Sequence, residues 1–323
     1  MPFQLPVRIT GFKATFRGSL NGSRTESFST AAIIRASLIA GHPEDGPVLD
    51  PLITAWREAC VRLALHLPTG PDRQTRALVH PKAWKNLEPS EKAGVNNMLG
   101  NTVTKLLAER LLSAPRMWFL DLYRKEYKAI VKRGQRPDFF ARARGNQWLA
   151  LEAKGRVNTP NDNSLSLAKL QASALEKVNG NPVVANIVCW TMARAGGLEV
   201  RLHDPKTHAK KELSIVVDYN QLLHDYYEPI QALIAASAPS GSIGNAKLFR
   251  FDAGDFSLGL HPIIEQALQT QSPEALINRF DNRRGLSRRL EDLHAGPDGI
   301  IIVPGRSWPI GLEQAETSVR HRG

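Results

Sequence analysis

One stretch of the chain, Arg136 to Arg156 (RPDFFARARGNQWLALEAKGR), constrains the fold more than any other feature. Its two halves, RPDFFARA and QWLALEAK, predict β-strands, and Arg144-Gly145-Asn146 between them has the composition of a tight turn. Because side chains alternate between the two faces of a strand, Glu152 and Lys154 share one face, while the apolar residues around them point into a core. We therefore expect a hairpin with one polar and one apolar face.

The length of the turn decides where Asp138 lies. A three-residue loop places Asp138 opposite Glu152, whereas a two-residue loop places it opposite Ala153. Cross-strand Cβ atoms are ~5 Å apart, so both registers bring the two carboxylates close, although only the first puts them on one face without a bulge. Two neighbouring carboxylates repel each other, and a hard cation such as Mg²⁺ relieves that repulsion and lowers the pKa of its bound water. Lys154 is then placed to orient that water or to stabilise negative charge on a phosphate.

Basic side chains are concentrated in the same region. Between Lys132 and Arg156, seven lysines and arginines accompany only two acids. Over the whole chain, 42 Lys and Arg residues outnumber 31 Asp and Glu residues, and the formal net charge is +11. This excess favours a polyanionic partner through phosphate contacts and counterion release. Many basic proteins bind no nucleic acid, so charge alone leaves both interpretations open.

The chain divides into three regions by its apolar periodicity and its turn signals. Residues 1–88 predict an N-terminal, mostly helical lobe, residues 89–236 a core, and residues 237–323 a C-terminal α/β extension that follows the Gly/Ser-rich linker APSGSIGN. The individual elements expected within them are short strands over about 6–18, helices over 30–41, 50–67, from Ser90 onward and over 166–178, and strands over 182–192 and 299–304. Their order predicts an α/β fold with a central mixed β-sheet flanked by helices.

Pro137-Asp138 followed by Glu152-Ala153-Lys154 resembles the signature of the PD-(D/E)xK nuclease superfamily, and the resemblance covers about residues 90 to 204. It implies a restriction-endonuclease-like core in which Asp138 and Glu152 ligate Mg²⁺ or Mn²⁺ and Lys154 acts on the attacking water. By the family pattern, the backbone carbonyl of Ala153 is a further metal ligand.

The resemblance also implies a further Glu from a preceding helix, and Glu109 matches that position. Glu109 continues an apolar helical stripe through Val95, Met98, Thr102 and Leu106, where a charge needs a reason. The alternative is a Glu at the edge of the stripe that reaches solvent or pairs with a nearby arginine.

Some relatives similar to RecB carry a helical Gln with a Tyr four residues later. Here Gln171 is in the corresponding helix, but Leu175 stands where the Tyr would be, which departs from that pattern. The residues that we expect to contact nucleic acid are Arg136, Arg142, Arg144, Arg156, Lys169 and Gln171.

These features predict a Mg²⁺- or Mn²⁺-dependent nuclease with Asp138, Glu152, Lys154 and Glu109 as catalytic residues. DNA is favoured over RNA by the resemblance, and a role in bacterial defence, repair or mobile-element processing follows only by association. The alternatives are an inactive nucleic-acid-binding scaffold and a nuclease toxin that acts on DNA or RNA. A homodimer or a protein partner remains open.

No apolar run approaches the length of a membrane span, and the N-terminus lacks the apolar segment of a signal peptide. Cys60 and Cys189 lie far apart in apolar stretches, which indicates buried thiols. Together these features predict a cytoplasmic protein without membrane contact. Pro297-Asp298, which precedes the apolar GIIIV, indicates only a turn before a structural strand.

Overall fold

The predicted hairpin is present in the computed structural model, and its register follows from its turn. Strands β4 (Phe139–Ala143) and β5 (Gln147–Arg156) pair antiparallel, with Ala143 opposite Gln147 and Phe139 opposite Leu151. Gly145 and Asn146 adopt left-handed backbone angles, with φ of 75° and 60°, which a three-residue turn between strands requires. Of the two loop lengths left open by the sequence, the three-residue loop is present, and continuing the register by one residue sets Asp138 opposite Glu152.

The structure describes residues 2–13, 16, 18–39, 51–64, 86–123, 136–194, 197–204, 213–282, 294–306 and 308. No helix within these ranges is both long enough and apolar enough to cross a bilayer. Both cysteines are buried and unpaired, as expected.

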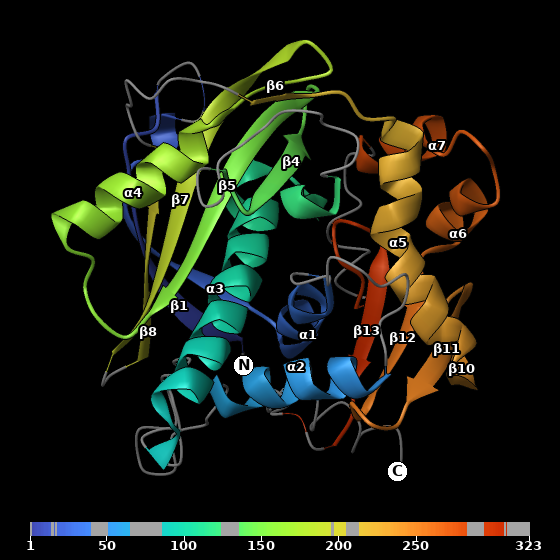
Figure 1. Cartoon of the computed structure of the whole chain (residues 1–323). Coiled ribbons are helices and arrows are strands. Elements are labelled where there is room, and N and C mark those ends of the chain that lie inside the picture. Colours follow the sequence, from blue (N-terminus) through green and yellow to red (C-terminus); the bar gives the residue numbers. More distant parts are fainter. Residues whose placement is uncertain are drawn as a thin grey trace.

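A large mixed sheet forms the centre of the molecule (Figure 1). Its path through the described strands is β2-β1-β8-β7-β5-β4-β3, with β6 paired to β7 and to β9. The strands besides β4 and β5 are β1 (Phe3–Thr10), β2 (Gly22–Phe28), β3 (Met117–Phe119), β6 (Leu175–Val178), β7 (Asn181–Arg194), β8 (Gly197–His203) and β9 (Leu213–Ile215). β5 and β7 are parallel, whereas β4 and β8 run antiparallel to them. A mixed sheet flanked by helices was expected, and it is confirmed.

Residues 1–88, predicted to form a mostly helical lobe with short strands over about 6–18, contribute two strands as well as helices. Strand β1 pairs in parallel with β8 and antiparallel with β2, so both strands extend the central sheet. Every second side chain of β1 is buried, which is why this short stretch stays in register at the sheet. Helices α1 (Thr30–Ile39) and α2 (Pro51–Ala64) follow where helices were expected.

Two helices cover opposite faces of the sheet around β5 (Figure 1). Helix α3 (Pro89–Leu112) lies so close to β5 that a Cβ added to Gly155 would be 1.6 Å from the carbonyl oxygen of Asn96. Helix α4 (Asp162–Ser173) packs Ala168 and Ala172 against alternate residues of β7 on the other face. Because Gly155 faces α3, Glu152 and Lys154 belong to the face that α4 partly covers.

Helix α4 ends earlier than the helix predicted over 166–178. The chain leaves the helix after Ser173, and Leu175–Val178 forms strand β6. Strand β6 turns back into β7 and also pairs in parallel with β9, so its conformation depends on partners that a local pattern does not contain.

A second sheet follows helix α5 (Tyr219–Ala235), in the order β10-β11-β12-β13. Its members are β10 (Ala238–Ile243), β11 (Ala246–Phe251), β12 (Phe256–Leu260) and β13 (Ile300–Pro304), with helices α6 (Pro262–Leu268) and α7 (Glu274–Asp281) inserted before β13. The segment APSGSIGN, which was predicted to be a linker, is edge strand β10 and its turn. Its small polar residues are tolerated because most of them are exposed and the strand pairs on one side only.

The close packing of α3 on β5 predicts opposite effects of two alanine substitutions on one helix. In Gly100→Ala the new Cβ would lie 2.7 Å from the backbone nitrogen of Gly155, so helix and strand must separate, at a cost of about 1–3 kcal/mol. In Gly94→Ala the new Cβ meets no atom within 4 Å, and we expect a gain of about 0.5–1 kcal/mol from helix propensity. Urea unfolding followed by circular dichroism measures both. Equal stability of the two variants would contradict the close contact.

Candidate active site

Asp138, Glu152 and Lys154 meet at the point where β4 begins beside β5. The backbone N–H of Asp138 donates to Glu152 Oε2 at 3.1 Å, and the backbone N–H of Ala153 donates to Asp138 Oδ2 at 2.9 Å. The Lys154 ammonium donates to Glu152 Oε1 from the same face of the strand. The hairpin therefore holds both carboxylates by its own backbone and brings the three predicted residues together.

The electrostatics of this trio are unbalanced. Glu152 is fully buried, and burial together with the charge of Asp138 raises the pKa of Glu152 to about 8, although Lys154 opposes the shift. Burial also raises the pKa of Asp138, and the charge of Lys154 and the N–H of Ala153 offset part of that increase. With two carboxyl groups and one ammonium, the trio retains a proton at neutral pH unless another cation takes its place.

The donor set fits a hard, oxygen-seeking ion that keeps part of its water shell. Within the described residues, no group of three or more His, Cys, Asp or Glu side chains is arranged to hold a metal. Mg²⁺ is commonly bound through one or two carboxylates, with water and substrate phosphates completing its shell. Asp138 and Glu152 are two carboxylates close enough together to serve in such a site. The role of the Ala153 carbonyl as a further ligand stays a prediction.

Glu109 is not brought to this site. Its Oε2 accepts a hydrogen bond from Arg35 Nη2 at 2.6 Å, and its Oε1 lies 2.7 Å from Lys105 Nζ. Helix α3, which carries Glu109, packs on the face of β5 opposite to Glu152, so the sheet stands between the two carboxylates. The apolar stripe indicated correctly that Glu109 is buried. Its charge is tolerated there because Arg35 and Lys105 pair with it in a buried ion cluster.

That cluster joins the two sheets through Asp298, which lies just before β13. Asp298 is fully buried; its Oδ1 lies 3.4 Å from Arg35 Nε, and its Oδ2 accepts a hydrogen bond from Tyr226 at 2.8 Å. Burial alone would raise the pKa of Asp298, but the nearby Arg35 and Lys105 charges outweigh it, and that pKa lies below its ordinary value. The turn predicted at Pro297-Asp298 is therefore also a structural ion site.

Two of the arginines expected to contact nucleic acid are engaged within the protein. Arg136 Nη2 donates to Asp121 Oδ2 at 2.7 Å. Arg142 donates to Glu274 Oε1 at 2.9 Å, and its guanidinium lies 3.9 Å from the ring centre of Tyr219. Both arginines have a structural role that the sequence did not indicate, and contact with nucleic acid stays a prediction for them.

The remaining residues expected at nucleic acid lie at different distances from the trio. Arg144 is exposed in the hairpin turn, at the far end of β5, whereas Arg156 is exposed two residues beyond Lys154. Lys169 and Gln171 are half-buried on α4. The pKa of His203 on β8 is lowered mainly by burial and further by the nearby charge of Lys169. Of this set, Arg156 adjoins the site most directly. Lys132 and Arg133 lie outside the described residues.

A neighbouring group of polar residues was not predicted. Trp190 on β7 pairs with Lys154 across the parallel ladder, and the loop that contains Asn158 follows β5 directly. The sequence predicted only that Trp190 belongs to the strand over 182–192. The polar run Asn158-Thr159-Pro160-Asn161 immediately after the motif was the signal that could have drawn attention to this end of the strand.

No protein family, curated protein or solved structure matches this chain. What the site can do therefore has to be inferred from its own residues and from the motif that they form.

The buried ion cluster predicts that Glu109→Gln destabilises the protein strongly. Removing one charge leaves Arg35 and Lys105 with an incomplete set of partners, and breaking a buried pair in this way costs about 3–5 kcal/mol. Arg110→Gln, one position along the same helix, removes a side chain that is 58% exposed and 3.4 Å from Glu26, so we expect a loss of less than about 1 kcal/mol. Urea unfolding compares the two. Similar losses would contradict the cluster.

The raised pKa of Glu152 predicts a pH-dependent stability in the metal-free protein. Glu152 titrates near 4.5 when unfolded and near 8 when folded, so between these values the folded state holds a proton that the unfolded state has lost. Raising the pH through this window therefore removes stability from the wild type, but not from Glu152→Gln. In EDTA, the Tm of Glu152→Gln minus that of the wild type should increase from about pH 5 to pH 9. A constant difference would rule out the shift.

Proposed function

We propose that this chain is a metal-dependent nuclease that hydrolyses phosphodiester bonds, with Asp138 and Glu152 as metal ligands and Lys154 as the residue that acts at the water. The observation that carries the proposal is the arrangement of this trio. Two abutting carboxyl groups, each held by a backbone N–H, share a single lysine as their cationic partner within the described residues. Such a group has an excess of negative charge that a divalent cation would neutralise.

The mixed sheet, with α3 and α4 on opposite faces of β5, is what we would expect of a restriction-endonuclease-like core, and the motif occupies the hairpin that the superfamily signature requires. Both agreements support the assignment. The basic character of the chain, with a net charge of +11, supports a nucleic-acid substrate, and the resemblance favours DNA. We also propose a cytoplasmic location, which the two buried, unpaired cysteines support.

The three side chains divide the chemistry between them. Mg²⁺ or Mn²⁺, when bound, would neutralise charge on the phosphate and lower the pKa of water. Asp138 and Glu152 would hold the ion, and the backbone N–H groups of Asp138 and Ala153 would keep their carboxylates aligned. Lys154 contacts Glu152 and its side chain is 20% exposed, so it can orient water and stabilise charge on a phosphate oxygen.

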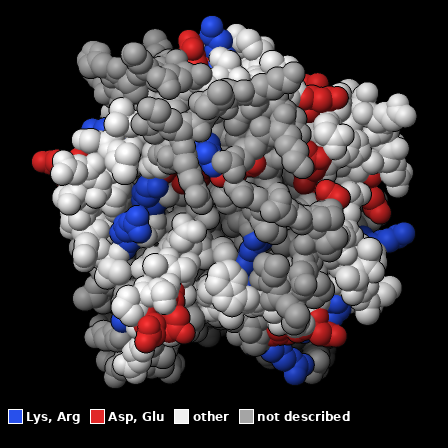
Figure 2. All heavy atoms as spheres, viewed as in Figure 1, with Lys and Arg blue, Asp and Glu red and all other residues white. Residues whose placement is uncertain are grey.

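On the face shown in Figure 2, described lysines and arginines are interspersed with acidic side chains and form no single broad patch.

The decisive assay compares the wild type with Asp138→Asn, Glu152→Gln and Lys154→Met on supercoiled, linear and single-stranded DNA and on RNA, with Mg²⁺ and with EDTA. We expect Mg²⁺-dependent cleavage by the wild type, reduced roughly 10²-fold or more in each variant. Glu228→Gln and Lys177→Gln are matched controls on exposed positions of α5 and β6, and they should cleave like the wild type.

Two results would contradict the proposed nuclease activity. The first is no Mg²⁺-dependent cleavage of any substrate by folded wild-type protein. The second is cleavage that the three substitutions leave unchanged. If the wild type binds DNA with a salt dependence but cleaves nothing, the inactive scaffold is the better description. Toxicity on expression that requires Asp138 would favour the toxin instead.

A further inference from the structure

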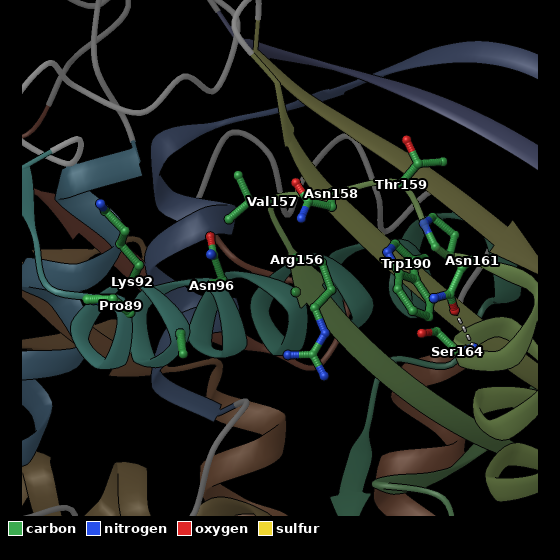
Figure 3. A pocket seen from close by; sticks show the side chains of 13 residues that line it. Pro89, Lys92, Asn96, Arg156, Val157, Asn158, Thr159, Asn161, Ser164 and Trp190 are labelled. Atoms are coloured by element: carbon green, nitrogen blue, oxygen red, sulfur yellow. Dashed lines mark hydrogen bonds between the residues drawn. The ribbon is translucent and has the colours of Figure 1, made fainter.

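A groove of about 490 Å³ opens at the carboxyl end of β5 (Figure 3). Its walls come from the first turns of α3, the last residues of β5, the loop that follows and the first turn of α4. Trp190 of β7 closes one side. Gly155 and Arg156 line the groove and directly follow Lys154 in sequence, so the groove begins one residue beyond the trio along β5.

The charge of the groove points to an anion. Lys92 and Arg156 both line it, and none of the described residues that line it is Asp or Glu. The other polar side chains are amides and hydroxyls, among them Asn96, Asn158 and Asn161. Figure 3 shows Arg156 in the middle of this group, with Lys92 and Asn96 on one side and Trp190 on the other.

A buried donor in the groove points to the same kind of ligand. Trp190 is 4% exposed, and in the described part of the chain its Nε1 has no hydrogen-bond partner. An indole N–H can only donate, and a buried donor without an acceptor is costly. In Figure 3 the nitrogen edge of the indole faces the side of the groove where Arg156 and Asn158 lie. A ligand oxygen at this place would satisfy it.

The beginning of α4 adds a weaker contribution. Asn161 is the N-cap of this helix, its side chain accepts from the backbone N–H of Ser164, and both residues line the groove. The N-terminus of a helix carries partial positive charge that favours anions. Asp162 in the first turn offsets part of that field, so the anion depends mainly on Lys92, Arg156 and Trp190.

We propose that this groove binds a backbone phosphate of the nucleic-acid strand, next to the phosphate that is cleaved. The inference rests on the proposed function for the identity of the strand. Arg156 and Lys92 neutralise the phosphate, and the Trp190 N–H donates to one of its oxygens. Because Trp190 pairs with Lys154 across the β5 and β7 ladder, a strand whose scissile phosphate lies at Lys154 passes directly into the groove.

The test measures binding, separately from cleavage. Fluorescence anisotropy with a fluorescein-labelled oligonucleotide, single-stranded and duplex, is recorded in EDTA at several salt concentrations. Arg156→Gln and Lys92→Gln should each lower the slope of log K against log salt by about 0.7–0.9, as expected for one lost phosphate contact. Trp190→Phe keeps a ring but loses the N–H, and it should weaken binding by about tenfold with little change in slope.

Arg306→Gln and Lys247→Gln remove the same charges from exposed positions near the second sheet, and they should bind like the wild type. Affinity and slope unchanged in Arg156→Gln, Lys92→Gln and Trp190→Phe would overturn the proposal, as would losses that the two controls share. Arg156 is exposed and Lys92 is half-buried, and neither belongs to the core, so these two variants keep the test valid if Trp190→Phe folds poorly.

Calorimetry with inorganic phosphate at constant ionic strength separates the two possible sources of the anion. If free phosphate binds through Arg156 and Trp190 while oligonucleotide affinity does not depend on them, the groove is a site for a small anion and the strand is excluded. Groove-dependent binding without any Mg²⁺-dependent cleavage would refute the nuclease but retain the groove as a nucleic-acid site, so the two failures are distinguishable.

Discussion

The backbone contact between α3 and β5 decides how the two faces of the central strand are used. Gly100 and Gly155 allow helix and strand to approach without intervening side chains, and a Cβ at either position would collide with the other's backbone or its neighbours. With α3 seated there, one face of β5 is sealed by the core, and the side chains that alternate with it, Glu152 and Lys154, are directed to the opposite face. The sidedness of the site is therefore a consequence of two residues that take no part in its chemistry.

Among the described residues, Glu109 and Asp298 form a buried pair of acids, whereas Asp138 and Glu152 form a pair of which Glu152 is fully buried and Asp138 half-buried, and the charges around each pair explain their roles. Glu109 and Asp298 are matched by Arg35 and Lys105, so burial creates a neutral cluster that joins the two sheets and the pKa of Asp298 is lowered. Asp138 and Glu152 have Lys154 as a single matching cation in the described structure, and the pKa of Glu152 rises to about 8. A balanced cluster stabilises the fold, whereas an unbalanced one costs stability unless a cation binds. Unbalanced burial is typical of functional sites.

What the sequence could predict depended on how local each interaction is. The hairpin was predicted correctly, and the register of Asp138 opposite Glu152 is one of the two that the sequence left open; it follows from three turn residues, of which Gly145 and Asn146 adopt left-handed angles. The partners of Glu109 could not be predicted. An apolar stripe indicates that a residue is buried but not which residues it contacts, and Arg35 lies 74 positions away in sequence. β10 was taken for a linker for a related reason: its small polar residues pair with β11 at an exposed edge, where neither apolar alternation nor β-branched residues are needed.

The place of the groove follows from how β5, α4 and β7 are connected. Parallel strands present their carboxyl ends at the same edge of a sheet, and the connection between them must leave from that edge. The chain leaves β5 after Arg156, crosses a polar loop and enters α4, so loop, helix N-terminus and the outer part of β7 all meet beside Lys154. A side chain at position 190 then faces both the helix and the groove. In the core cluster with Ala168, Ala172 and Met192 the Trp190 ring packs as an apolar group, while its nitrogen remains without a partner among the described residues. A buried N–H without a partner does not stabilise the core, and we therefore assign the Trp190 N–H to ligand binding rather than to core packing.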